Sequence, residues 1–385
     1  MNQLPEQILC AAGIPVYLRG FSAIDAYLER NSAAAVYIVC GANLAEIACL
    51  FEDLRYPGAA FADAAVDSNN KTWYFRCEDS LQISKVKNSF SFLEFYQDCK
   101  TRRFYDPNGI YPCLRRIKYL ENSDSKPWQN SQNYSFSSPY RTLFDMAMIL
   151  AKYFPETGIP EIHQIAAGLS PLAGYAPPST EEQRVLLTEM LDTANPCAGF
   201  ELLRKCGFIA AHWPELAALN DVDHSKEFHP EGNGWKHTME TLPHRKANGR
   251  KTGFNLKLSL GLLLHDCGKP LSNAAGSKRF FAHAELGERQ ARKFLERLGF
   301  DKLLIRDVCY LVRNHMLPAA LPKLPLKRTG EIMESDLFPL LMELYRCDES
   351  SSFKGLDGYY RSSAAYQSYL KHRRNPYRSL TARQE

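Results

Sequence analysis

The chain has 385 residues, of which 45% are hydrophobic and 23% charged, a composition typical of soluble globular proteins that excludes a largely disordered chain. Its formal net charge of +4 at pH 7 permits an acidic ligand such as a nucleotide or RNA without requiring one. We expect a cytoplasmic protein without a membrane segment, because no stretch reaches the roughly 18 apolar residues that a spanning helix needs and the start has no basic region typical of a secretory signal.

The 11 cysteines are scattered singly along the chain, and no C-x-x-C pair occurs. This spacing fits neither a disulfide framework nor a zinc ribbon, and it favours reduced thiols. Most of them are expected to be small core residues.

The first part of the chain alternates strand-like and helix-like segments. Residues 34–41 and 71–77 are rich in β-branched and aromatic residues and predict strands. Residues 42–55 carry apolar side chains at helical spacing and predict a helix. We therefore expect a small α/β head at residues 1–125.

Beyond a Ser-, Asn- and Gln-rich stretch at 121–138, which predicts a loop, nearly every segment predicts a helix. Residues 138–154 open with Ser-Pro, and residues 179–194 open with an S-x-x-E capping box. At least five more helical segments follow residue 200. The expected fold class is α+β and mostly α, with a linker and helical neck at 126–222, an all-α domain at 223–370 and a basic tail at 371–385.

Imidazole and carboxylate groups recur along the predicted helical domain. A histidine and an aspartate stand side by side where the apolar run "LLLHDCGKP" ends, and most of the other candidates lie at ends or faces of predicted helices. Each residue alone would more often be a helix cap or a surface group, so only the ordered set indicates a site. Its members are His237, His265, Asp266, His283, His315 and Asp348.

This set of ligands suits two divalent metal ions, with Mn, Fe, Co, Ni, Zn and Mg all possible identities. A bridging carboxylate at Asp266 would allow the two ions to share a ligand. Two metals a few ångström apart are a common means of activating water for phosphoester cleavage. The residues therefore indicate metal-dependent hydrolysis of a phosphate ester.

The order H…HD…H…H…D resembles the HD phosphohydrolase superfamily. The resemblance implies that His237, His265, Asp266 and Asp348 hold one metal and that His283 and His315, with Asp266 bridging, hold the second.

The resemblance also covers Lys269, which occupies the last position of an HD-x-x-K pattern. It implies catalytic roles for Asp266 and Lys269, with the ammonium neutralising a substrate phosphate. Lys269 could instead be a cation favoured by the C-terminus of a helix. Arg279 is a weaker candidate for the same contact with phosphate.

Residues 200–222 and 227–242 resemble the neck and the start of the HD domain of bacterial tRNA nucleotidyltransferases. These enzymes are the CCA-adding branch of the poly(A) polymerase family. His229, in "HPEG", matches a motif of that family. It is expected either to support a metal ligand or substrate phosphate or to stabilise a turn.

The same resemblance implies a nucleotidyltransferase head with a Gly-Gly turn, an Arg-Asp pair and a D-x-D motif for magnesium. Here Cys40 replaces the first glycine, and no carboxylate-x-carboxylate triplet occurs in the first 200 residues. Asp63 and Asp67 are four residues apart, too far to share one metal from a strand. Arg141 alone remains of an Arg-rich helix that reads the nucleotide. We expect a head that keeps its fold and has lost polymerisation.

Three functions follow as alternatives. The first is an HD phosphohydrolase that cleaves a phosphomonoester, a nucleotide or a 2′,3′-cyclic phosphate. The second is a protein that binds tRNA or another RNA and whose HD domain is accessory. The third is an active CCA-adding nucleotidyltransferase, which the missing D-x-D opposes on chemical grounds.

Overall fold

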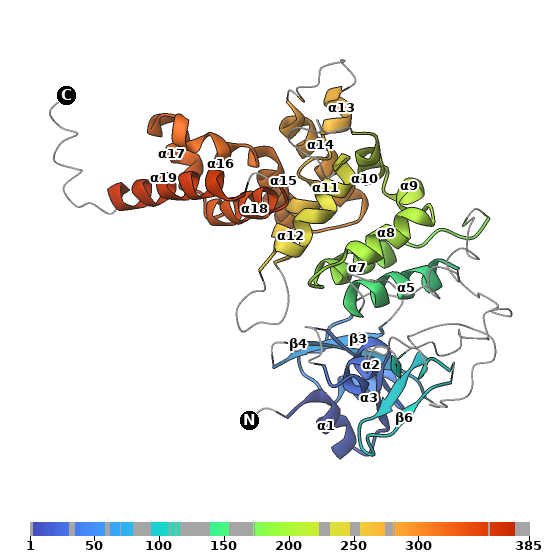
Figure 1. Ribbon diagram of the computed structural model, residues 1–385. Coiled ribbons are helices and arrows are strands. Elements are labelled where there is room, and N and C mark those ends of the chain that lie inside the picture. The colour runs from blue at the N-terminus through green and yellow to red at the C-terminus, as the bar shows by residue number, and fades with distance from the viewer. Residues whose placement is uncertain are drawn as a thin grey trace. The chain divides into compact units, whose positions relative to one another are not determined.

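The computed structural model describes residues 3–30, 35–57, 62–69, 71–79, 94–107, 109–111, 114–115, 139–153, 172, 174–222, 232–246, 255–273, 280, 282–352 and 355–373. It divides into two compact units. The first contains Met1–Asp192 and Ala198–Cys206, and the second contains Thr193–Cys197, Gly207–Lys246 and Phe254–Glu385. The expected fold class is confirmed, because the first unit carries a small sheet and the second is helical throughout its described part (Figure 1).

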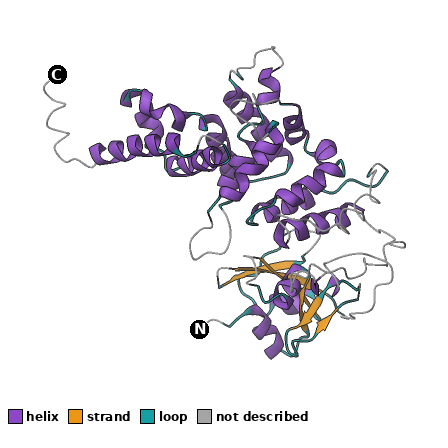
Figure 2. Cartoon of the chain, in the orientation of Figure 1, coloured by secondary structure: helices purple, strands orange, loops and turns teal. Residues whose placement is uncertain are grey.

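The first unit is built on a six-stranded sheet with strand order β3-β4-β2-β1-β5-β6. Only the β2–β4 pairing is parallel, and the other four pairings are antiparallel. All described strands belong to this unit (Figure 2). They are β1 (Val16–Arg19), β2 (Ala35–Cys40), β3 (Ala64–Ser68), β4 (Lys71–Cys77), β5 (Tyr96–Asp98) and β6 (Phe104–Tyr105).

The two predicted strands are confirmed as β2 and β4, but the helix predicted at 42–55 is wrong in length. The helix at this place, α3 (Leu44–Ala48), has a capping box between Asn43 and Glu46 and ends after five residues. Phe51 then packs its ring against Phe75 of β4, with 5.3 Å between ring centroids. The apolar residue at position 51 therefore contacts the sheet from beyond the end of the helix, and it does not continue the helix.

Two groups of helices complete the first unit. Helix α2 packs against β1, β2 and β5, and α5 packs against α7. The capping box predicted at the start of α7 is present between Ser179 and Glu182. The helices are α1 (Pro5–Ala11), α2 (Phe21–Tyr27), α5 (Pro139–Tyr153), α7 (Thr180–Leu191) and α8 (Cys197–Lys205).

The second unit is organised around α12 (Leu256–Leu264), in which every residue from Leu258 onward is buried. Helix α12 packs against α11, α15 and α18, and α14 packs along α15. No helix in the described ranges is long and apolar enough to cross a membrane. The other helices are α9 (Phe208–His212), α10 (Pro214–Ala217), η2 (Ala218–Asp221), α11 (Gly234–Thr241), η3 (Leu242–His244), α13 (Lys269–Asn273), α14 (His283–Arg297), α15 (Lys302–Asn314), α16 (Leu317–Ala320), η4 (Leu321–Lys323), α17 (Leu326–Met333), α18 (Phe338–Ser350) and α19 (Asp357–Arg373).

Two sequence predictions fall wholly or mostly outside the described residues. The predicted loop at 121–138 lies outside them entirely. Of the basic tail predicted at 371–385, the first three residues belong to α19 and the remainder lies outside. The division into head, neck and HD domain at the predicted boundaries stays a prediction.

Candidate metal centre and head pocket

The six side chains of the predicted metal set lie together in the second unit. His237 lies in α11, Asp348 lies in α18, and His283 is the first residue of α14. His265 directly follows α12, and Asp266 comes next in the chain. His315 directly follows α15. All six line one cavity of about 420 Å³. Five of the six are at most 9% exposed, and only Asp348, in α18, is more open. The set is His237, His265, Asp266, His283, His315 and Asp348.

Three of the histidines are oriented by the same local contact. The Nδ1 atoms of His265, His283 and His315 lie 2.7, 2.8 and 2.7 Å from the backbone carbonyl three residues earlier. A carbonyl only accepts, so each Nδ1 carries a proton, and in the neutral ring Nε2 presents a lone pair. This is the tautomer in which Nε2 can bind a metal.

The Asp266 carboxylate lies between two groups of potential ligands. Its Oδ1 lies 3.8 Å from the Nε2 atoms of both His283 and His315. Its Oδ2 lies 3.3 Å from His265 Nε2 and 3.9 Å from His237 Nε2. The geometry therefore allows one oxygen to face each group, as a bridging carboxylate requires.

The first group is completed by Asp348, whose Oδ1 lies 3.0 Å from His237 Nε2. The ligand atoms within each group lie no more than 4.8 Å apart, the groups being His237, His265 and Asp348, and Asp266, His283 and His315.

The titration of these groups reflects burial and charge together. Burial, helped by the nearby His265, lowers the pKa of His315 to about 4, and burial also lowers the pKa of His283. Burial alone would lower the pKa of His265, but the neighbouring Asp266 carboxylate raises this pKa to about 9. Burial opposes ionisation of Asp266, yet the His265 and Lys269 charges hold its pKa well below the ordinary range. In the second group both imidazoles are therefore neutral at pH 7.

The residues fit divalent metal ions by one contact and by the chemistry of the donor set. His265 Nε2 and Asp266 Oδ2 are buried 3.3 Å apart, and the Lys269 ammonium lies 2.6 Å from Oδ2, so a cation already neutralises this carboxylate. The Nε2 atoms of His283 and His315, both of which present lone pairs, lie 3.0 Å apart. Buried polar atoms are nearly always paired. A cation in the second group would satisfy these two nitrogens, and imidazole with carboxylate suits divalent transition metals.

A glycine allows the turn after α12 to approach α14 closely. A Cβ at Gly268 would lie 2.0 Å from the carbonyl oxygen of His283 and 2.4 Å from the amide nitrogen of Gly287. These neighbours are backbone atoms and cannot move aside by rotating a side chain. The glycine thus permits His283 to lie beside the His265–Asp266 pair.

Lys269 lies at the metal set, but not at the C-terminus of a helix. It is the first residue of the short helix α13, so the macrodipole explanation for a cation at this position is wrong. Its ammonium lies 2.6 Å from Asp266 Oδ2 and 5.4 Å from the centroid of the Phe280 ring. The ammonium therefore lies beside the ligand groups and neutralises part of the charge of Asp266.

Several residues of this cavity were missed from the sequence, because no motif marks them. Phe280, Met316, Tyr345 and Glu349 line it together with the ligands. Met316 directly follows a predicted ligand and is 52% exposed. Two sequence candidates, His229 and Arg279, lie outside the described residues.

Among the described residues of the head, the acidic side chains do not form a compact metal set. Asp63 accepts a hydrogen bond of 2.8 Å from the Cys77 amide and lies 3.4 Å from Arg76. Asp67 pairs with Arg55 at 2.6 Å. The position two residues after Asp63 is Ala65, so the strand offers no second carboxylate there.

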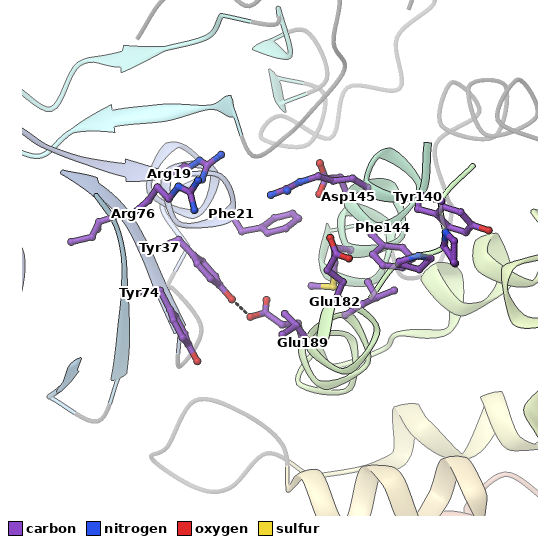
Figure 3. Close-up of a pocket in the computed structure, with 18 residues that line it drawn as sticks. Arg19, Phe21, Tyr37, Tyr74, Arg76, Tyr140, Phe144, Asp145, Glu182 and Glu189 are labelled. Atoms are coloured by element: carbon purple, nitrogen blue, oxygen red, sulfur yellow. Dashed lines mark hydrogen bonds between the residues drawn. The ribbon is translucent and has the colours of Figure 1, made fainter. Parts of the chain in front are cut away.

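The first unit nevertheless has a cavity of about 350 Å³, which strands of the head and helices α5 and α7 line together. Figure 3 shows Tyr37 and Tyr74 side by side on the sheet, with Glu182 and Glu189 facing them from α7. The two tyrosine rings are stacked at 5.3 Å, and the Tyr37 hydroxyl donates a hydrogen bond to Glu189. Arg141, which the family resemblance singled out, also lines this cavity.

Comparison with known families finds a match within the helical unit. The HD domain family model matches residues 234–340. The match contains five of the six residues of the metal set, and Asp348 follows it. The class of domain that the fold and site define is therefore an HD domain.

Curated relatives are identified over part of the chain. A CC-adding tRNA nucleotidyltransferase of Thermus thermophilus is 31% identical over 175 residues, which are 44% of this chain and 39% of the relative. A multifunctional CCA protein of Halorhodospira halophila is 38% identical over 117 residues, 30% of this chain and 27% of the relative. The aligned region thus spans well under half the length of these relatives.

A solved structure extends the likeness of fold to nearly the whole chain. The CCA-adding enzyme of Bacillus stearothermophilus in complex with CTP aligns with a TM-score of 0.52 and 14% identity, covering 95% of this chain and 81% of that one. Residues 234–340 therefore match the HD domain model, and part of the chain is similar in sequence to CCA-adding tRNA nucleotidyltransferases.

Proposed function

We propose that the chain is a metal-dependent phosphohydrolase that acts through the HD site on a phosphomonoester, a nucleotide or a 2′,3′-cyclic phosphate. The observation that carries the proposal is the arrangement of two ligand groups around Asp266, whose two oxygens face different groups. Ions bound there would activate a water and stabilise the negative charge that develops on phosphorus.

The residues of the chain would supply orientation and charge. The His265, His283 and His315 rings are fixed by their backbone carbonyls, so their Nε2 atoms need no reorganisation when ligands bind. Lys269 would turn from Asp266 toward a phosphate oxygen once the carboxylate charge is otherwise neutralised. The Phe280 ring lies under the ammonium and would keep it close to the site.

The test is phosphate release from a panel of mononucleotides, 2′,3′-cyclic nucleotides and a generic phosphodiester, with Mn, Ni, Co or Mg added. We expect release from at least one class, and loss of at least a hundredfold in Asp266→Ala. His212→Gln, outside the site, is the matched control. Equal release from wild type and Asp266→Ala would assign the activity to a contaminant and refute the proposal.

A second candidate is supported at least as well by the relatives. Their names are those of tRNA nucleotidyltransferases, and this candidate is a protein that binds tRNA, with or without nucleotide addition, and whose HD domain is accessory. The cavity beside Arg141, with its stacked tyrosines, supports nucleotide binding by the head. The absence of a D-x-D triplet from the first 200 residues argues against metal-dependent addition by this chain.

Two measurements separate the candidates. Labelled nucleotide incorporation into tRNA that lacks its 3′ terminus would establish transferase activity if it survives Asp266→Ala. A shift of tRNA mobility without incorporation or phosphate release would favour an RNA-binding protein. We expect neither to replace phosphate release as the main activity.

A further inference from the structure

Two cysteines of the head lie directly opposite one another on neighbouring strands. Cys40 ends β2 and Cys77 ends β4, and the parallel register pairs them residue for residue. The carbonyl of Cys40 accepts a hydrogen bond of 3.0 Å from the Glu78 amide, which fixes this register. Neighbouring strands are about 4.8 Å apart. This spacing lies within the range of about 4.4–6.8 Å that disulfides span between Cα atoms.

Both thiols point to the same face of the sheet, since paired residues of parallel strands share a face. It is the face of Ile38 and Phe75, two residues before each cysteine, and it packs into the core. Cys40 is fully buried, whereas Cys77 is partly exposed. A small oxidant can therefore reach Cys77 first, with Cys40 held next to it.

The pair also has the asymmetry of an attacking thiol and a resolving thiol. The Cys40 thiol donates a hydrogen bond of 3.4 Å to the Arg76 carbonyl, and its interaction with the neighbouring Cys77 thiol raises the pKa of Cys40 and lowers that of Cys77. A larger thiolate fraction makes Cys77 the better nucleophile toward an oxidant at neutral pH.

We propose that Cys40 and Cys77 form a redox-active dithiol that a hydroperoxide converts into a disulfide between β2 and β4. The Cys77 thiolate attacks one peroxide oxygen, so that an S–O bond forms, the O–O bond breaks and the leaving hydroxide takes up a proton as water. The Cys40 sulfur then attacks the Cys77 sulfenic acid, the S–S bond forms and a second water leaves with the Cys40 proton. One hydrogen peroxide is reduced to two waters as two thiols are oxidised.

This site does not depend on the metal centre and lies on the sheet face opposite Tyr37 and Tyr74. A disulfide would fix the spacing of the two strands that carry these tyrosines behind the head cavity. Oxidation would thus affect the two strands of the head that line the cavity, although the disulfide itself would lie on the opposite face of the sheet.

The experiment is treatment of the reduced full-length protein with hydrogen peroxide, followed by alkylation under denaturing conditions and mass spectrometry without reduction. We expect a peptide pair joined through Cys40 and Cys77, loss of two of the 11 thiols, and full recovery with dithiothreitol. Loss of the Cys77 thiol should be about tenfold faster than that of the exposed Cys49.

Three variants make the test decisive. Cys49→Ser should form the same linked peptide, whereas Cys77→Ser should not. Cys40→Ser should leave a sulfenic acid on Cys77 that dimedone labels. Oxidation of Cys77 in the wild type while Cys40 remains open to alkylation, or oxidation of Cys77 no faster than Cys49, would overturn the proposal.

Discussion

His283 and His315 direct their Nε2 atoms at each other across 3.0 Å, although each ring already donates its Nδ1 proton to a backbone carbonyl. Two neutral imidazoles in this tautomer present lone pairs to one another and cannot form a hydrogen bond. Burial keeps both rings neutral at pH 7, because it lowers their pKa values. The contact is stabilised when a cation lies between the two nitrogens.

We therefore predict that the purified protein binds two equivalents of divalent transition metal. His315→Ala should retain about one equivalent, because it removes a ligand from the second group alone, and His237→Ala should likewise retain about one. Elemental analysis after dialysis against trace metal-free buffer measures both. Binding of two equivalents by either variant would contradict the assignment of the groups, and His212→Gln should match the wild type.

Lys269 gives a prediction that separates catalysis from metal binding. Its ammonium neutralises Asp266 at 2.6 Å, so Lys269→Met should leave metal content unchanged or raise metal affinity. The same change should lower kcat for phosphate release by about a hundredfold, since it removes one positive group from the developing charge. Lys269→Arg should recover part of the rate. Unchanged kcat with altered metal affinity would assign Lys269 a purely structural role.

A buried ion pair predicts a pH-dependent stability of the second unit. Asp307 of α15 is 4% exposed and lies 2.6 Å from Lys257 of α12. Burial opposes its ionisation, but hydrogen bonds from Lys257 and Arg306 hold the pKa of Asp307 below the ordinary value. A lowered pKa in the folded state stabilises the fold above the unfolded pKa of about 3.9, and this stabilisation is lost as pH falls through the folded value.

Asp307→Asn should therefore lower the free energy of unfolding by about 1–2 kcal/mol at pH 7. The difference from wild type should shrink below about pH 4, where the carboxyl of the unfolded chain becomes protonated while that of the folded protein stays ionised, and it should vanish below the folded pKa. Urea unfolding at pH 7 and at pH 3.5 tests this, with Glu296→Gln on the exposed side of α14 as the control. A difference that is constant with pH would show that packing and not charge is responsible.

The first unit depends on a buried carboxylate between α2 and α5. Asp25 is 2% exposed and accepts hydrogen bonds of 2.6 Å from Lys152 and from the Tyr153 hydroxyl. Asp25→Ala leaves the Lys152 charge without its partner and should cost about 3 kcal/mol, measured by urea unfolding. The exposed Asp53→Asn should cost less than about 0.5 kcal/mol. Equal small effects of both changes would contradict a structural role for this pair.

The six candidate metal ligands could be predicted because the type of each residue and its order along the chain can be read directly from the sequence. The sequence also placed the start of α7 well, since Ser179 and Glu182 form a capping box. These are local signals, and the folded chain keeps them.

Other features required the folded chain. Strands β5 and β6 have three and two residues, too few for an alternating pattern to be read. Phe51 continues the apolar spacing of α3 but packs from a turn onto Phe75, so tertiary contact overrides the period. Phe280 and Met316 reach the metal cavity from separate segments, and neither carries a motif.

The most direct test of the account is phosphate release measured as the metal-free protein is titrated with Mn, in parallel with direct measurement of bound metal. The account predicts little release with one equivalent bound and a rise of at least tenfold as the second equivalent binds, with no rise in His315→Ala. A protein that binds two equivalents and releases no phosphate from any substrate of the panel would contradict the proposed hydrolytic function and favour the tRNA-binding candidate.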